Sequence, residues 1–92
     1  MREIKITMLC RSLAGQDKGK VFAVLGEEGE YLLIADGRGR SAERPKRKKR
    51  KHVQIIVHLP EAAAEAAAAA EQDADIRKLL KVYKQENDNR RS

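Results

Sequence analysis

One stretch of the sequence concentrates the side chains that could do chemistry, RGRSAERPKRKKRKH at residues 38–52, the basic strip. It contains nine of the twenty Lys and Arg residues and a single acid, Glu43, so its formal charge is +8. The flanking segments, 1–37 and 53–92, each hold one more acid than base, which leaves the whole chain at +6. The sequence therefore describes a nearly neutral protein with one cationic strip, for which polyphosphate is the first candidate partner. The alternative is a solvated loop or a localisation signal.

The basic strip supplies most of the candidate RNA-binding residues. Six consecutive bases at 46–51 repel one another within a Debye length, and phosphate would relieve that repulsion. Arginine can bind phosphate through two hydrogen bonds at once, whereas lysine mainly adds field strength. His52 can stack on a base or contact phosphate, or can simply be a satisfied histidine at the start of a strand. The candidates in the strip are Arg38, Arg40, Arg44, Lys46, Arg47, Lys48, Lys49, Arg50, Lys51 and His52.

Catalysis and metal binding find no support in the sequence. The two histidines and the one cysteine, Cys10, lack metal-ligand spacing, and neither a nucleotide-hydrolase phosphate loop nor a Ser/His/Asp set is recognisable. We therefore expect no enzyme activity, metal, cofactor or small-molecule substrate. A single cysteine excludes an intramolecular disulfide, and no apolar run suits a signal peptide or the ~20 residues of a membrane span. The expectation is a soluble, cytoplasmic protein without a membrane partner.

Four apolar segments predict the strands that must position the basic strip. They are residues 4–10, 20–26, 30–36 and 53–59, joined mostly by short glycine-containing turns to which Asp17 and Asp36 are assigned. Short strands in such close succession predict a small antiparallel barrel, which also removes exposed sheet edges. The basic strip then forms the loop before the last strand. Because its ends are anchored and its middle is charged, we expect residues 41–49 to order only on RNA.

The sequence changes character at Pro60. Residues 61–72 are alanine-rich and favour a helix, but an all-alanine face buries little area, so this segment can also be frayed or a spacer. Residues 73–86 form a better-specified amphipathic helix, and the two segments can fuse into one. The predicted organisation is a barrel at 1–59, a helical extension at 60–86 and a disordered tail at 87–92. The apolar stripe, which packs on the barrel or on a second copy, comprises Ile76, Leu79, Leu80 and Tyr83.

Two strings of residues resemble a known family. LCRSLAGQDKGK at 9–20, followed by VFAV at 21–24, resembles the KOW motif of ribosomal proteins and transcription elongation factors. LIADG at 33–37, with RPKRKKRKHVQ at 44–54, is similar to short bacterial KOW-domain RNA-binding proteins, relatives of an archaeal and eukaryotic large-subunit ribosomal protein family. The helix resembles the C-terminal part of that group, whereas the alanine tract does not. The resemblance implies a mainly β fold, an SH3-like barrel with a C-terminal helical extension, and RNA binding.

The KOW-like turn adds further candidate residues. Gly15 and Gly19 allow backbone N–H groups to approach phosphates, and Lys18 and Lys20 supply charge, although the glycines can simply make a turn. Arg11, at the end of the first strand, is either a contact or a solvated surface charge.

Structured RNA is the predicted partner; ribosomal RNA is the leading candidate, and ribosomal proteins are further candidates. We expect no exposed aromatic platform for base stacking, and no helix carries the basic strip into a major groove. A protein-interaction adaptor that uses the barrel and the C-terminal helix is the alternative, because barrels of this kind also bind polypeptides.

Overall fold

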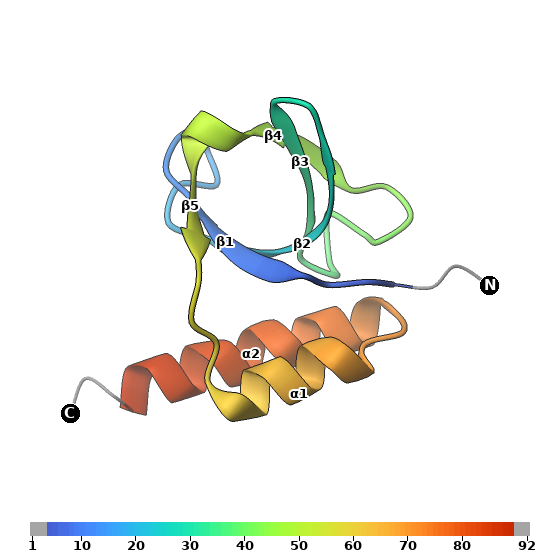
Figure 1. The fold of residues 1–92 in the computed structure, drawn as a ribbon, viewed down its shortest axis with the longest axis vertical. Helices are drawn as coiled ribbons and strands as arrows, with labels where there is room; N and C mark the ends of the chain where they lie inside the picture. Colours follow the sequence, from blue (N-terminus) through green and yellow to red (C-terminus); the bar gives the residue numbers. More distant parts are fainter. Residues whose placement is uncertain (1–3, 90–92) are drawn as a thin grey trace.

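The computed structural model describes residues 4–89. Five strands form one antiparallel sheet in the order β4-β3-β2-β1-β5, and it curls into a barrel-like ring (Figure 1). The strands are β1 (Met8–Ser12), β2 (Val21–Glu28), β3 (Tyr31–Ala35), β4 (Lys46–Lys49) and β5 (Val53–Ile56). A single 3-10 turn, η1 (Arg50–His52), connects β4 to β5, so the two edge strands of the sheet are consecutive in the chain. The antiparallel sheet predicted from the sequence is confirmed.

Alternation along the strands divides the apolar core into two clusters. Leu9 and Cys10 are neighbours in β1 and both are fully buried, yet they belong to different clusters because successive side chains point to opposite faces of a strand. One cluster comes only from the strands: Cys10, Phe22, Val24, Leu32, Ile34 and Val53. The other joins the opposite face of the sheet to the helices: Leu9, Ala23, Ala35, Ala63, Ala67, Ile76, Leu79 and Tyr83.

The C-terminal segment is a hairpin of two helices, α1 (Glu61–Ala69) and α2 (Asp73–Asn89), which lie side by side against the sheet (Figure 1). The chain turns between them at residues 70–72, where the Asp75 carboxylate accepts hydrogen bonds from the backbone N–H groups of Glu71 and Gln72. Small side chains allow α1 to pack closely, and Ala63 and Ala67 are buried in the cluster that also contains residues of the sheet and of α2. The alanine tract is therefore a packed helix of its own, neither fused with α2 nor a spacer.

The apolar stripe of α2 belongs to the core. Ile76 and Leu79 are fully buried, Tyr83 is nearly so, and Leu80 packs against the same cluster. The helix continues through residues 87–89, which the sequence had placed in a disordered tail; the rest of that tail, 90–92, lies outside the described residues. Within residues 4–89, neither helix is long and apolar enough to cross a membrane.

The basic strip differs most from its predicted form. Residues 46–49, expected to be part of a poorly ordered loop, form β4, which pairs with β3 in the register Tyr31↔Lys49 to Ile34↔Lys46. A charged edge strand is compatible with a sheet because its outward side chains stay hydrated and discourage pairing with another chain. The strand boundaries also shift, since β1 begins only at Met8 and β5 ends at Ile56.

Candidate nucleic-acid interface

The first turn, residues 13–20, is held tightly at its base. Gly15 and Gly19 have φ values of 85° and 90°, so both adopt the left-handed conformation that glycine tolerates best. The Gly19 N–H donates to the Ser12 carbonyl at 2.8 Å, and the Arg11 guanidinium donates to the Gly19 carbonyl at 3.0 Å. As a result Lys18 and Lys20 are exposed on a rigid turn, with the Arg11 side chain laid along its end.

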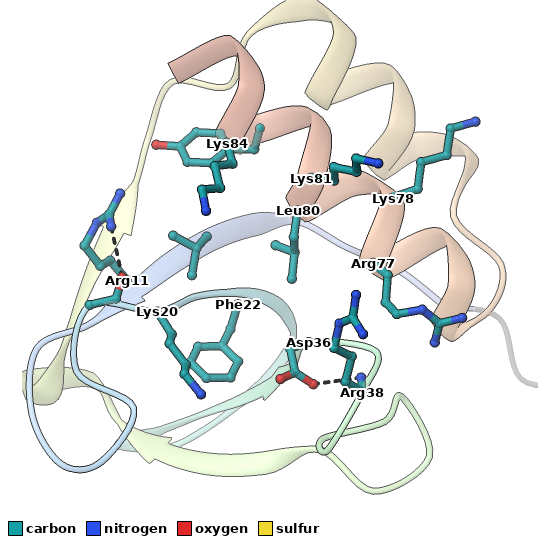
Figure 2. Close-up of a pocket in the computed structure, with 13 residues that line it drawn as sticks. Arg11, Lys20, Phe22, Asp36, Arg38, Arg77, Lys78, Leu80, Lys81 and Lys84 are labelled. Carbon is teal, nitrogen blue, oxygen red and sulfur yellow. Dashed lines mark hydrogen bonds between the residues drawn. The ribbon is translucent and has the colours of Figure 1, made fainter. Parts of the chain in front are cut away.

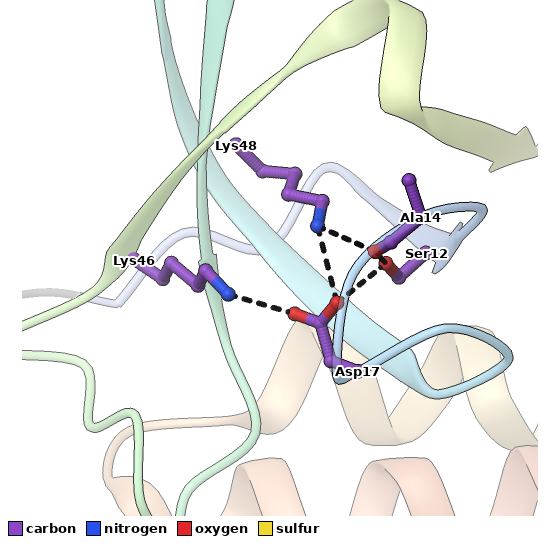
Figure 3. A network of polar contacts seen from close by, with 5 residues as sticks. All are labelled: Ser12, Ala14, Asp17, Lys46 and Lys48. Carbon is purple, nitrogen blue, oxygen red and sulfur yellow. Dashed lines mark hydrogen bonds and ion pairs between the residues drawn. The ribbon is translucent and has the colours of Figure 1, made fainter.

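A buried carboxylate ties this turn to β4. Asp17 is 9% exposed, and it accepts hydrogen bonds from the Ser12 hydroxyl at 2.7 Å, Lys46 Nζ at 2.9 Å and Lys48 Nζ at 3.1 Å (Figure 3). Lys48, also 9% exposed, donates to the Ala14 carbonyl as well, at 2.9 Å. The Lys48 ammonium is thus a structural partner of the turn, although the sequence assigned it to RNA.

The network changes the acidity of two buried groups. Burial alone would raise the pKa of the Asp17 carboxyl, but hydrogen bonds from Lys46, Ser12 and Lys48 outweigh burial and hold that pKa well below its ordinary value. Burial, reinforced by the negative charge of Asp17, raises the pKa of the Cys10 thiol to about 11, against a smaller opposing effect of Lys48. Asp17 therefore stays ionised and Cys10 stays protonated at neutral pH.

Two other bases of the strip face acids of the β2–β3 hairpin. Arg50 pairs with Glu27, and it also donates to the Gly29 carbonyl at 3.3 Å. Arg47 Nε lies 3.4 Å from a Glu28 carboxylate oxygen. These pairs are half exposed and each contributes little to stability, but they partly neutralise the strip.

Other bases of the strip remain available to a ligand. Among the described residues, no carboxylate forms an ion pair with Lys49 or Lys51, and these two lysines line a small hollow with Arg50 and Glu30. Arg44 is exposed in the turn before β4, where its backbone N–H bonds Ser41. His52 is half-buried, and its carbonyl accepts a hydrogen bond from the Leu13 N–H at 2.8 Å.

An open groove of about 830 Å³ lies between the sheet and α2 and is called the α2 groove (Figure 2). Arg11, Lys20 and Arg38 line it from the sheet side, and α2 adds four bases that the sequence analysis did not single out. Among residues 4–89, Asp36 is the only acid in its lining, and that carboxylate accepts hydrogen bonds from the backbone N–H groups of Arg38 and Arg40. The α2 bases are Arg77, Lys78, Lys81 and Lys84.

A second hollow of about 350 Å³ continues from the groove toward β4. It contains Arg40 and Lys46 from the basic strip, together with the hydrogen-bonded acids Asp17 and Asp36, and it shares Lys20 with the α2 groove. Lys20 thus belongs to both hollows and links the basic strip to α2 in one basic surface.

The turn after β3 fixes α2 beside the sheet. Arg77 Nη1 donates to the Gly37 carbonyl at 2.6 Å, and the Ala42 N–H donates to an Asp73 carboxylate oxygen at 2.7 Å. Gly37 has a φ of 77°, and a Cβ on it would lie 2.5 Å from the Asp73 carbonyl oxygen. Glycine is required here both by the backbone conformation and by the close approach of the helix, so the wall of the groove is firmly placed.

In comparisons with known proteins, no protein-family model matches the chain and no curated protein matches it. The interpretation therefore rests on the geometry described above. Among residues 4–89, no group of three or more His, Cys, Asp or Glu side chains is placed to hold a metal ion.

Proposed function

We propose that this chain is a non-enzymatic RNA-binding protein of the KOW type, with an SH3-like barrel, associated with ribosomal RNA or the ribosome. One observation carries the proposal: bases from the first turn, the basic strip and α2 form a continuous surface through Lys20. Phosphate is the ligand that such a surface attracts, because each contact releases condensed counterions. The KOW-like turn and the basic strip, which carry the family resemblance, both contribute to it.

The mechanism is electrostatic docking on a phosphate backbone, in which shape contributes more than base sequence. Lys18 and Lys20 stand on a turn that is rigid before binding, and the Asp17 network holds β4 against that turn. Lys49 and Lys51, which line a separate hollow, offer a further place for phosphates. Because these elements are preorganised, little conformational entropy is lost on association.

A protein-interaction adaptor is the second candidate, and three exposed apolar side chains favour it. Leu13 is 47%, Ile55 37% and Val57 78% exposed, and Ile55 belongs to the edge strand β5. An open edge strand can accept a strand from another polypeptide. The sequence had based this alternative on the barrel and on the apolar stripe of α2. Most of that stripe is buried, so the support now comes from the exposed edge of the sheet.

The test is the salt dependence of binding to a labelled structured RNA, measured by fluorescence anisotropy. Five or more phosphate contacts give a slope of log K against log salt of about −3.5 or steeper. Replacing Lys49 and Lys51 by glutamine reduces the slope by about 1.4–1.8, whereas Lys5→Gln, outside all the basic hollows, leaves it nearly unchanged. Binding that is absent, or that does not depend on salt, contradicts the proposal. Crosslinking in cells and sequencing of the bound RNA then identifies the partner.

A further inference from the structure

We propose that the α2 groove binds an unpaired RNA strand, with α2 as one wall and the first turn and the β3–β4 connection as the other. The inference rests on the proposed function and assigns it a site and a ligand class. In this assignment α2 contacts RNA directly, in addition to packing on the sheet. An unpaired strand offers both of the chemistries that the groove presents, a line of phosphates and the flat faces of bases.

The wall formed by α2 is a ladder of positive charge. Arg77, Lys81 and Lys84 follow the i, i+4, i+7 spacing of one helix face, Lys78 stands beside them, and all four side chains are exposed. From residue 77 to residue 84 the helix rises ~10 Å, which spans roughly three nucleotides of a stacked strand at ~3.4 Å each. Within residues 4–89, none of the four forms an ion pair with a carboxylate.

The opposite wall is also basic and is already fixed. Figure 2 shows Lys20 and Arg38 across the groove from α2, with Leu80 and Phe22 between the two walls. Arg38 is exposed, and its backbone N–H donates to the Asp36 carboxylate, which stands among seven bases in the lining of the groove. Phosphates entering the groove therefore meet cations on both sides.

The floor of the groove is apolar, and this feature favours binding of a single strand over binding of a duplex. Val21 and Leu80 are half-buried there, and Phe22 and Tyr83, which are 3% and 8% exposed, also line the groove. An unpaired nucleotide can place its base on this floor while its phosphates stay at the basic rim. A duplex keeps its bases stacked inside and presents phosphates alone, so the floor would remain uncovered. An acidic peptide offers carboxylates to the rim but no flat aromatic face to the floor.

The experiment compares three probes with the full chain: an unstructured ten-nucleotide RNA, the duplex of the same sequence, and polyglutamate of equal charge. The wild type is expected to bind the single strand most tightly. Lys81→Gln with Lys84→Gln removes two phosphate contacts, which reduces the salt slope by about 1.4 and the affinity at 0.1 M salt by about 25-fold. Lys5→Gln is the control for charge lost outside the groove. Leu80→Ala, checked for folding by circular dichroism, lowers single-strand affinity without changing the salt slope.

The outcomes distinguish this inference from the proposed function. If the wild type binds neither these RNA probes nor the labelled structured RNA, the proposed function fails and the inference fails with it. If it binds the structured RNA but neither short probe, only the inference is overturned. If it binds RNA but the α2 variant matches Lys5→Gln, the groove is not the site and only the inference is overturned. Equal or tighter binding of the duplex, or equal binding of polyglutamate, also overturns the unpaired-strand assignment and replaces it with duplex or acidic-peptide recognition respectively.

Discussion

Replacing Asp17 by asparagine tests whether the basic strip is built into the fold. The amide keeps the shape of the carboxylate but removes the charge that compensates the Lys48 ammonium, which is 9% exposed and would keep only neutral acceptors such as the Ala14 carbonyl. Removing one partner of a buried ion pair costs about 3–5 kcal/mol. We take about 3 kcal/mol, because the amide oxygen still accepts a hydrogen bond and the Lys46 side chain, 32% exposed, can turn to water. In a domain of this size that lowers Tm by ~12–24 °C.

The effect has a defined pH dependence. The folded-state pKa of Asp17 lies below its ordinary value of 3.8, so its contribution to stability is complete above about pH 4 and declines as the pH falls toward the folded-state pKa. The difference in free energy of unfolding between wild type and Asp17→Asn therefore varies by no more than about a tenth between pH 5 and pH 7, and it becomes smaller at pH 3. Wild type loses stability in acid faster than the variant does.

The assay is urea unfolding followed by circular dichroism at pH 7, 5 and 3. Glu43→Gln is the matched control, because Glu43 is exposed and also lies in the basic strip, and it changes stability by less than about 0.5 kcal/mol. Adding Lys48→Met to Asp17→Asn removes the unpaired buried ammonium and recovers part of the loss. A variant within about 0.5 kcal/mol of wild type at pH 7, or one with an unchanged acid dependence, would refute the ion-pair reasoning.

Two further predictions concern a glycine and the thiol. Gly37→Ala destabilises the fold by at least about 1–2 kcal/mol in thermal melts, because alanine is strained at a φ of 77° and its Cβ meets the Asp73 carbonyl oxygen. The same substitution weakens RNA binding because it disturbs the position of α2. Gly39→Ala is the control, since there is open space around Gly39, and equal destabilisation by both variants would contradict the clash. Cys10, with a pKa of about 11, reacts with a disulfide reagent at pH 8 at least about 100-fold more slowly in the folded protein than in urea; fast labelling of the folded protein would contradict its burial.

The regular strands could be predicted because their signal is local. The apolar runs around Phe22 and Leu32 carry two buried faces in a few residues, and the structure places β2 and β3 there. β4 was missed because a run of bases has no apolar alternation, and the interaction that turns it inward comes from Asp17, 31 residues before Lys48. A prediction made from the residues next to Lys48 in the sequence cannot take that distant carboxylate into account.

The α2 groove was missed for a related reason. The sequence contained the signal of a basic helix face at Arg77, Lys81 and Lys84, but the apolar stripe of the same helix was the stronger pattern. Whether those bases meet Lys20 depends on where α2 docks, and docking is decided by contacts such as Arg77 with the Gly37 carbonyl, 40 residues away. In the sequence, the excess positive charge lies in the basic strip. In the folded protein, the bases of the proposed surface come from three segments: the first turn, the basic strip and α2.

Internal pairing also changes the role assigned to the basic strip. The sequence predicted that RNA phosphates compensate the repulsion among six adjacent bases, and therefore that the basic strip becomes ordered only when RNA binds. In the folded protein Asp17, Glu27 and Glu28 supply counter-charge, and β4 forms without a ligand. The protein therefore presents a preformed surface, so association can be steered by charge without waiting for a folding step. Stopped-flow association rates should then rise linearly with RNA concentration and fall with added salt; a rate that saturates at high RNA concentration would restore the model of an ordering loop.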